Sequence, residues 1–449
     1  MIPDTVIVLA KSPRPGRVKT RLQPTFSGAE AAALAAASIR DTLDTVARLG
    51  PRRLVVAWDG PPVGWLPPQA VVLPQRGTGL DERLEHVFAD VFALDPAPGG
   101  VDIGPGRPTL LVGMDTPQLA PRDLDVDWAG HDAVLGPSED GGYWAIGFRR
   151  YVAGAIRGVP MSTSATGNVQ YARLKALGLD VLELPALLDV DEPADAARVA
   201  AGWPGSRFGR LHRRLVESPC SPTILFDAAL AGAAVEIRVG EHGEGTVLSI
   251  DGATPAESGL GALIRPGHLD TSAWQRMSEA DEVVVSRCEG PVLDVGCGPG
   301  RFVEALASRG VPVLGVDLSR AAVDQTRLRG ASALVRDVND RLPGEGRWGT
   351  VLLADGNIGI GGDPLALLRR CRDLLRPGAV ALVETSVDPH EDRRTTVTLH
   401  GPSGRRSHAV PWAVVGAQAV VELAARAGFV AVEDWRVSGR SFVMLRHAG

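Results

Sequence analysis

Short apolar runs alternate with longer amphipathic or alanine-rich segments along most of the 449-residue chain. An apolar run bounded by glycine, proline or acidic residues is typical of a buried strand, and the segments between such runs are long enough for helices. This alternation predicts parallel sheets covered by helices on both faces. The strands expected in the first half are residues 6–10, 53–58, 109–115, 132–135 and 184–188. Those expected in the second half are residues 292–295, 311–316, 333–335, 349–353, 380–385, 429–435 and 441–445.

Two segments depart from this alternation. Residues 234–239 and 246–250 alternate apolar and polar side chains with glycines between them, which predicts a β-hairpin. Residues 388–406 are charged and contain scattered histidines, so we expect a loop there, either solvated or acting as a lid over a substrate. The helix after the first strand is expected to begin at a capping box made by Ser27 and Glu30.

The length of the chain exceeds what one hydrophobic core usually organises, so two domains are expected. The boundary is predicted in residues 206–225, where arginines make the chain basic and Pro219 and Pro222 interrupt a helix. This gives an amino-terminal domain of residues 1–205 and a carboxyl-terminal domain of residues 226–449, whose sheet core begins at about residue 270. The expected fold class is α/β, with two Rossmann-like three-layer domains.

The clearest ligand-binding pattern is the sequence Pro291-Val-Leu-Asp-Val-Gly-Cys-Gly-Pro-Gly300. A strand that breaks into glycines and continues as a helix forms the nucleotide-binding corner of a doubly wound sheet. Glycine lets the backbone turn tightly or come close to a ligand. The next strand ends on Asp317, about 20 residues after the turn, where a carboxylate can accept hydrogen bonds from ribose hydroxyls. A glycine-rich turn without a ligand is the alternative.

This motif resembles the first motif of class I S-adenosylmethionine-dependent methyltransferases, and the resemblance covers about residues 270–449. It differs from the dinucleotide-binding pattern G-x-G-x-x-G, because an acid precedes the first glycine. The resemblance implies S-adenosylmethionine as the cofactor. It also implies an acid near the adenine amine. The cofactor-binding residues predicted from the motif and the strand ends are Asp294, Gly296, Gly298, Gly300, Asp317 and Asp337.

The fourth strand of this domain ends in Ala354-Asp355-Gly356-Asn357, followed by further glycines. In the methyltransferase fold, this strand end lies beside the methyl group that is transferred. We therefore predict Asp355 and Asn357 as catalytic residues that orient the nucleophile, and a flexible loop is the alternative. No motif identifies the acceptor beyond a small molecule.

The first strand is followed at once by a basic loop stiffened by prolines. Lysine supplies a point charge to phosphate oxygens, and arginine supplies a fork of donors. A rigid basic loop at a strand end therefore suits a nucleoside diphosphate or triphosphate, and a solvated surface loop is the alternative. The residues predicted to contact the phosphates are Lys11, Arg14, Lys19 and Arg21.

Acidic residues stand at other strand ends of the first half. Asp115 can hold Mg²⁺ or Mn²⁺ against a diphosphate or can cap a helix. Three acids, Asp189, Asp191 and Glu192, can complete that metal site, with Asp191 as the predicted ligand, or can cap the helix that begins near Pro193. Asp140, in the turn Asp140-Gly-Gly142, is predicted to bind a substrate hydroxyl, and a plain turn is the alternative.

The first half carries a second resemblance, over about residues 4–202. The motifs Lys-Ser-Pro-x-Pro-Gly-x-Val-Lys-Thr-Arg-Leu, Gly-x-Asp-x-Pro, Gly-Pro-x-x-Asp-Gly-Gly-Tyr and Asp-Val-Asp occur in this order. They resemble the bacterial GT-A-fold glycosyltransferase-like family, which is related to nucleotidyltransferases that include 2-phospholactate guanylyltransferase. The resemblance implies a nucleotide-diphospho-sugar transferase fold, with the basic loop facing phosphates and Asp115 facing a metal ion. Met114-Asp115 replaces the usual D-x-D pair, which leaves nucleotidyl transfer open beside glycosyl transfer.

Composition argues against several classes of protein. The net charge of −6 and an aromatic content of 5% argue against nucleic-acid binding. The four cysteines have no metal-ligand spacing, no apolar run is long enough to span a membrane, and the first residues do not resemble a signal peptide. We therefore expect a cytoplasmic enzyme, and the oligomeric state is not predicted.

The two resemblances together predict a bifunctional transferase. Its first half would transfer a sugar from a nucleotide sugar with the help of a metal ion, and its second half would methylate a small molecule. Two alternatives remain open for the first half. It is either a nucleotidyltransferase that uses a nucleoside triphosphate or a nucleotide-binding module without catalysis.

Overall fold

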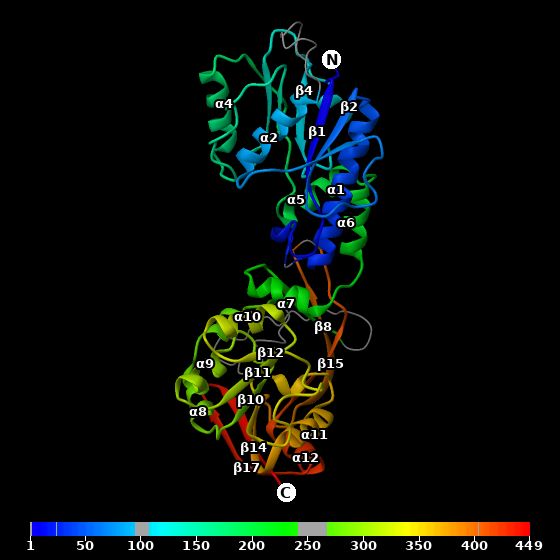
Figure 1. Ribbon diagram of the computed structural model, residues 1–449. Helices are drawn as coiled ribbons and strands as arrows, with labels where there is room; N and C mark the ends of the chain where they lie inside the picture. The colour runs from blue at the N-terminus through cyan, green and yellow to red at the C-terminus, as the bar shows by residue number, and fades with distance from the viewer. Residues whose placement is uncertain (1, 24, 95–106, 241–266, 403) are drawn as a thin grey trace. The chain divides into compact units, whose positions relative to one another are not determined.

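The computed structural model describes residues 2–23, 25–94, 107–240, 267–402 and 404–449. The chain forms two compact units, Met1–Leu215 and Val216–Gly449, shown from blue to red in Figure 1. The boundary between the units falls inside the segment predicted as a linker. That segment is helical, with α6 at Arg207–Glu217 and α7 at Pro222–Leu230.

The first unit contains a seven-stranded sheet with the order β3-β2-β1-β4-β6-β5-β7. All neighbouring strands are parallel except β6, which is antiparallel to both β4 and β5. The strands are β1 (Thr5–Lys11), β2 (Arg53–Asp59), β3 (Val71–Pro74), β4 (Thr109–Gly113), β5 (Ala133–Pro137), β6 (Tyr143–Phe148) and β7 (Val181–Glu183).

The strand predicted over residues 184–188 is misplaced, because the last strand of this sheet, β7, covers Val181–Glu183. Pro185 has no amide hydrogen for a sheet ladder. The chain continues beside β5 with single hydrogen bonds, from the amide of Leu184 to the carbonyl of Leu135 and from that of Leu187 to Pro137. This irregular run leads directly to the acidic residues 189–192.

Helices cover both faces of this sheet (Figure 1). The capping box predicted at Ser27 and Glu30 is present, with both hydrogen bonds formed at the start of α1. Buried alanine and aliphatic side chains of α1 pack on one face, while side chains of α2 and α4 pack on the other. The helices of the unit are α1 (Gly28–Leu49), α2 (Leu80–Ala93), α3 (Pro121–Leu124), α4 (Thr166–Ala176) and α5 (Pro193–Gly202).

The second unit contains a seven-stranded sheet with the order β12-β11-β10-β13-β14-β18-β17. Strands β10 to β14 are parallel, and β18 is antiparallel to both of its neighbours. The strand order reverses beside β10, which creates a crevice at its carboxyl end. The strands are β10 (Val292–Val295), β11 (Val313–Asp317), β12 (Ala333–Val335), β13 (Trp348–Leu353), β14 (Leu375–Thr385), β17 (Phe429–Val437) and β18 (Arg440–His447).

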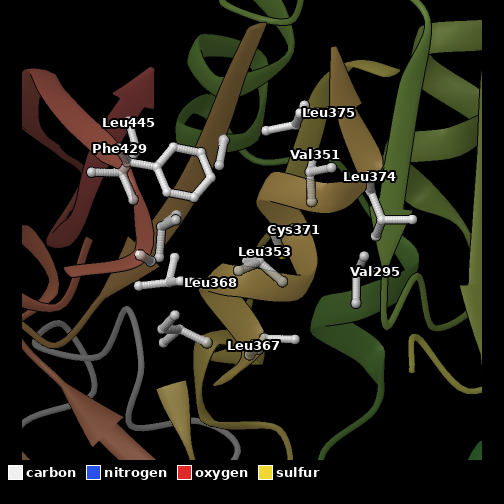
Figure 2. Close-up of a cluster of buried hydrophobic side chains, with 14 of the residues drawn as sticks. Val295, Val351, Leu353, Leu367, Leu368, Cys371, Leu374, Leu375, Phe429 and Leu445 are labelled. Atoms are coloured by element: carbon white, nitrogen blue, oxygen red, sulfur yellow. The ribbon is translucent and has the colours of Figure 1, made fainter. Parts of the chain in front are cut away.

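The core of this sheet lies between its strands and two helices, α11 (Pro364–Leu374) and α12 (Ala417–Ala427). Figure 2 shows Leu367, Leu368 and Cys371 of α11 pointing toward strand residues such as Leu353. The opposite face carries α8 (Glu279–Ser286) and α9 (Arg301–Ser308). Helix α10 (Arg320–Leu328) packs beside α9. None of the helices in the described residues is long and apolar enough to cross a bilayer.

A separate antiparallel sheet has the order β16-β15-β8-β9. Its strands are β8 (Glu236–Gly240), β9 (Gly267–His268), β15 (Asp392–His400) and β16 (Val410–Val415). The first arm of the predicted hairpin is β8, and the second arm, residues 246–250, lies outside the described residues. The loop predicted over 388–406 is largely wrong. Residues Thr395 to Leu399 alternate between the two faces, which buries Val397 and Leu399 and makes a strand.

We expect Leu368→Ala to lower the unfolding free energy of the second unit by about 2–5 kcal/mol, because the side chain is fully buried and its removal leaves a cavity. Leu328→Ala is the matched control, because Leu328 is 87% exposed and its truncation should change the stability by less than about 0.5 kcal/mol. Urea unfolding followed by circular dichroism measures both. Equal effects of the two substitutions would contradict this packing.

Candidate functional site

A cavity of about 380 Å³ opens at the carboxyl ends of β10, β11, β12 and β13 in the second unit. These strand ends flank the point where the strand order reverses. Six of the predicted site residues line the cavity. They are Gly296, Gly298, Asp317, Asp337, Asp355 and Asn357.

The glycine turn and Asp317 are joined by hydrogen bonds. The amide of Gly298 donates to Asp317 Oδ2 at 2.9 Å, and the amide of Ser319 donates to Asp317 Oδ1 at 2.7 Å. Burial raises the pKa of Asp317 above its usual value. Gly298 has a φ of 53°, and a Cβ atom at this position would meet no atom within 4 Å, so its open side faces space beside the cavity. This geometry allows a ligand to approach the backbone closely.

Asn357, in the short helix η3 (Asn357–Gly359), supports the same turn. Its Nδ2 donates to the carbonyls of Val295 at 2.8 Å and Gly296 at 3.0 Å. A Cβ atom on Gly296 would lie 2.6 Å from this nitrogen, so only glycine fits. The side chain of Asn357 therefore fixes the glycine turn, and its predicted catalytic role stays a prediction.

Asp355 belongs to a buried group of charges. It accepts two hydrogen bonds from Arg301, at 2.7 and 2.8 Å, and one from Arg440 at 3.3 Å. Arg301 also donates to Asp281 at 3.0 and 3.2 Å, and Arg440 donates to Glu384 at 2.7 and 2.6 Å.

Burial costs these charges much of their hydration, and mutual pairing offsets that cost. Burial alone would raise the pKa of Asp281, but Arg301 and Arg440 lower it to about 2. Asp355 and Arg301 both line the cavity. The carboxylate of Asp355 is engaged by two guanidinium groups, and its predicted catalytic role stays a prediction.

Two of the residues predicted for the second unit, Asp294 and Gly300, do not line the cavity. Gly300 has a φ of 89° at the start of α9, and a Cβ there would lie 2.4 Å from Thr326 Oγ1, so glycine is required by packing. Asp294 is 1% exposed, and its Oδ2 has no hydrogen-bond partner in the described residues. Burial raises the pKa of Asp294 to about 7; Arg301 opposes this rise, and nearby acids add to it.

In the first unit, Lys19 is the centre of the predicted phosphate and metal residues. Its Nζ lies 2.6 Å from Asp115 and 3.2 Å from Asp191, and it also donates to the carbonyl of Val190. Burial lowers the pKa of Lys19, but the two carboxylates outweigh this and raise it overall. Arg21 reaches Asp191 at 2.9 Å. The structure therefore brings together four of the predicted residues.

The other predicted residues of this unit lie nearer the surface. Lys11 at the end of β1 and Arg14 are exposed. Asp140 is also exposed, and its Oδ1 accepts the amide of Gly142 at 2.8 Å in a tight turn. Asp189, which precedes Asp191, accepts a hydrogen bond from Ser138 at 2.9 Å. The charge of Asp140 is near enough to Asp189 to raise its pKa.

The carboxylates of this site have the chemistry of a divalent-cation site. Mg²⁺ is commonly held by one or two carboxylates together with substrate phosphates. Asp189 Oδ1 is buried without a hydrogen-bond partner in the described residues. Burial, followed by the charge of Asp115, raises the pKa of Asp189 to about 7. No group of three His, Cys, Asp or Glu is arranged around one point in the described part of the chain. Asp115 and Asp189 fit a two-carboxylate site, in which Asp115 is also paired with Lys19. Asp191 is paired through both of its oxygens, with Lys19 and with Arg21.

The two halves of the chain match different known proteins. Residues 34–163 match the family model "Uncharacterized protein conserved in bacteria (DUF2064)", and residues 273–434 match "Methyltransferase domain". A 3-phospho-D-glycerate guanylyltransferase of Phenylobacterium zucineum is 30% identical over 214 residues, which are 42% of this chain and 87% of that protein. The chain belongs to this guanylyltransferase family in its first unit. Its second unit carries the methyltransferase domain and resembles class I S-adenosylmethionine-dependent methyltransferases.

A ubiquinone biosynthesis O-methyltransferase of Acinetobacter baylyi is 30% identical over 118 residues, 24% of this chain. The chain spans about half the length (49%) of that curated relative. Among solved structures, a nucleotide-diphospho-sugar transferase from Desulfovibrio desulfuricans G20 is 27% identical, with a TM-score of 0.41 over 47% of this chain and 95% of that one. A methyltransferase from Bacteroides fragilis in complex with S-adenosyl-L-homocysteine is 20% identical, with a TM-score of 0.40 over 51% and 95%.

We expect Gly298→Ala in the methyltransferase unit to weaken the binding of S-adenosylhomocysteine by about tenfold or more, because the methyl group would enter the space beside the cavity. Gly310→Ala is the matched control. Gly310 also has a positive φ, 75°, with open space around it, but it does not line the cavity. Both substitutions should cost about 1–2 kcal/mol of stability from backbone strain. Calorimetric titration separates them, and equal affinities would contradict the assignment.

We expect Asp294→Asn to change how stability depends on pH. A carboxyl group with a pKa of about 7 in the folded unit stabilises it below the usual pKa of about 3.9, and this contribution is lost as the pH rises through 7. The variant should therefore gain more than about 1 kcal/mol relative to the wild type between pH 5 and pH 8. Urea unfolding measures this gain, with the exposed Asp434→Asn as the control. A constant difference between the wild type and Asp294→Asn would contradict the raised pKa.

Proposed function

We propose that the chain is a bifunctional transferase. Its second unit transfers the methyl group of S-adenosylmethionine to a small-molecule acceptor. Its first unit transfers a nucleotidyl group from a nucleoside triphosphate to a small molecule that carries phosphate. The observation that supports the methyl transfer best is the cavity at the reversal of strand order, where the Gly298 amide and the Asp317 carboxylate meet.

In the second unit, the residues of the cavity would bind and orient the cofactor and the acceptor, and would not need to activate the methyl group. When bound, S-adenosylmethionine supplies a methyl group that is already activated as a sulfonium, so alignment provides much of the rate. Asp317 would accept hydrogen bonds from ribose hydroxyls, and Asp337 would accept one from the adenine amine. Asn357 holds the glycine turn. Asp355, which is fixed by Arg301, lines the cavity and would orient the acceptor.

In the first unit, the residues are suited to triphosphate chemistry. Lys19, Arg21, Lys11 and Arg14 would offset the charge of the phosphate oxygens. Asp115 and Asp189, with Asp191 adjacent, would hold Mg²⁺ or Mn²⁺, which lowers the cost of charge on the departing pyrophosphate. Asp140, exposed in its turn, would accept a hydrogen bond from a substrate hydroxyl. Two features support nucleotidyl transfer over glycosyl transfer: the missing D-x-D pair and the match to a guanylyltransferase over most of its length.

We expect the full chain to release pyrophosphate from GTP when Mg²⁺ and 3-phosphoglycerate are present. Lys19→Met should lower this rate on the order of 10²-fold, as loss of a charge-stabilising donor does in other enzymes. The exposed Lys175→Met on α4 is the control and should leave the rate unchanged. Release of a free nucleoside diphosphate from a sugar nucleotide would instead favour glycosyl transfer. The absence of both reactions would favour a non-catalytic first unit.

A further inference from the structure

The cavity of the second unit has two chemically distinct sides. Among the described residues, every charged side chain that lines the cavity comes from the strand-end side. These are Arg301, Asp317, Arg336, Asp337 and Asp355. Their formal charges sum to −1, because two arginines face three aspartates. The opposite side comes from α7, the small antiparallel sheet and the segment between β9 and α8.

Apart from Thr223 of α7, the described residues of the opposite side have apolar or aromatic side chains, and none of them is charged. Ile237 of β8, Val397 and Leu399 of β15 and Leu269 are each less than 10% exposed and pack in one cluster with Trp274. The alternation of β15 explains this, because its apolar residues share one face of the small sheet. The alternating pattern of β15 therefore contributes to an apolar wall on the side of the cavity opposite the strand ends.

Aromatic rings form the flat parts of this wall. Phe226 of α7 and Trp274 are stacked, with ring centroids 5.4 Å apart and planes at 22°. Trp412 of β16 lines the same cavity and bridges to Ile360, directly after η3. This places an aromatic ring beside the strand end that carries Asp355 and Asn357. Flat rings bind well against such surfaces through stacking and apolar burial.

We propose that this wall, defined by Phe226, Ile237, Trp274, Val397, Leu399 and Trp412, binds the methyl acceptor through a flat, uncharged ring. The inference rests on the proposed function, since it names the acceptor class of the same cavity. An anionic group against this wall would lose hydration without gaining a counter-ion. The two arginines of the cavity belong to the strand-end side and not to this wall. Arg301 is already paired with two carboxylates, and Arg336 is exposed at the strand-end side.

The test uses the full chain saturated with S-adenosylhomocysteine and three pairs of probes. Each pair is one ring compound with and without a carboxylate: catechol and 3,4-dihydroxybenzoate, indole and indole-3-carboxylate, and 2-naphthol and 6-hydroxy-2-naphthoate. We expect the neutral member to bind at least about tenfold more tightly, since an unpaired buried carboxylate is strongly disfavoured. Calorimetric titration gives both affinities.

Two variants locate the binding. Phe226→Ala removes half of the stacked pair and should weaken the binding of the best neutral probe by about fivefold to tenfold, with S-adenosylhomocysteine affinity unchanged within about twofold. Val430→Ala, at an exposed position of β17, is the control and should change neither. The comparison of probe pairs on the wild-type chain stands whether or not Phe226→Ala folds.

The outcomes separate the two claims. If the carboxylates bind as tightly as their neutral partners, or if no probe binds while S-adenosylhomocysteine does, the inference about the acceptor is overturned and the proposed methyl transfer is not. If S-adenosylhomocysteine itself does not bind, the proposed function of the second unit fails, and the acceptor inference fails with it.

Discussion

Both units depend on buried cations held between carboxylates at the carboxyl ends of their strands. In the first unit the cation is Lys19, which joins Asp115 to Asp191. In the second it is a pair, Arg301 and Arg440, which joins acids of several elements. A buried charge is stable only when it is paired, so each cation fixes the relative positions of the strand ends around it.

The two clusters differ in what they leave for a ligand. Lys19 is surrounded by acids, and Asp189 keeps a buried oxygen without a partner in the described residues. A further cation and the phosphates that accompany it suit such an excess of acids. In the second unit, the arginines use most of their donors on protein carboxylates, and the glycine turn leaves backbone beside open space. That arrangement suits a cofactor recognised by backbone shape and a few oriented acids.

The small antiparallel sheet adds a surface that the seven-stranded sheet does not supply. Its strands come from residues before β10 and from the segment between β14 and α12. The parallel sheet provides the charged side of the cavity, and the added sheet provides the apolar side. In our proposal, the cofactor and the acceptor would be recognised by different parts of the same unit, which would let the acceptor change while the cofactor side stays the same.

The sequence alone determined the fold class and both family resemblances, because glycines and acids placed directly after apolar runs are local signals. The roles that it assigns to the site residues stay predictions. The sequence also determined the capping box of α1, which needs only Ser27 and Glu30. The tertiary structure decided which of these residues face a cavity. Asp294 and Gly300 belong to the same motif as Gly298, yet they face the protein interior.

The pairing of Lys19 with Asp191 joins residues more than 170 positions apart, and Arg440 reaches Asp281 over a similar separation. Local sequence patterns do not predict contacts between residues so far apart in the chain. The sequence did not predict the strand β15, because charged residues at its start interrupt the alternation of apolar and polar residues that follows. Local patterns fix the type of an element, whereas burial and charge pairing depend on which strand ends meet, and only the assembled sheets decide that.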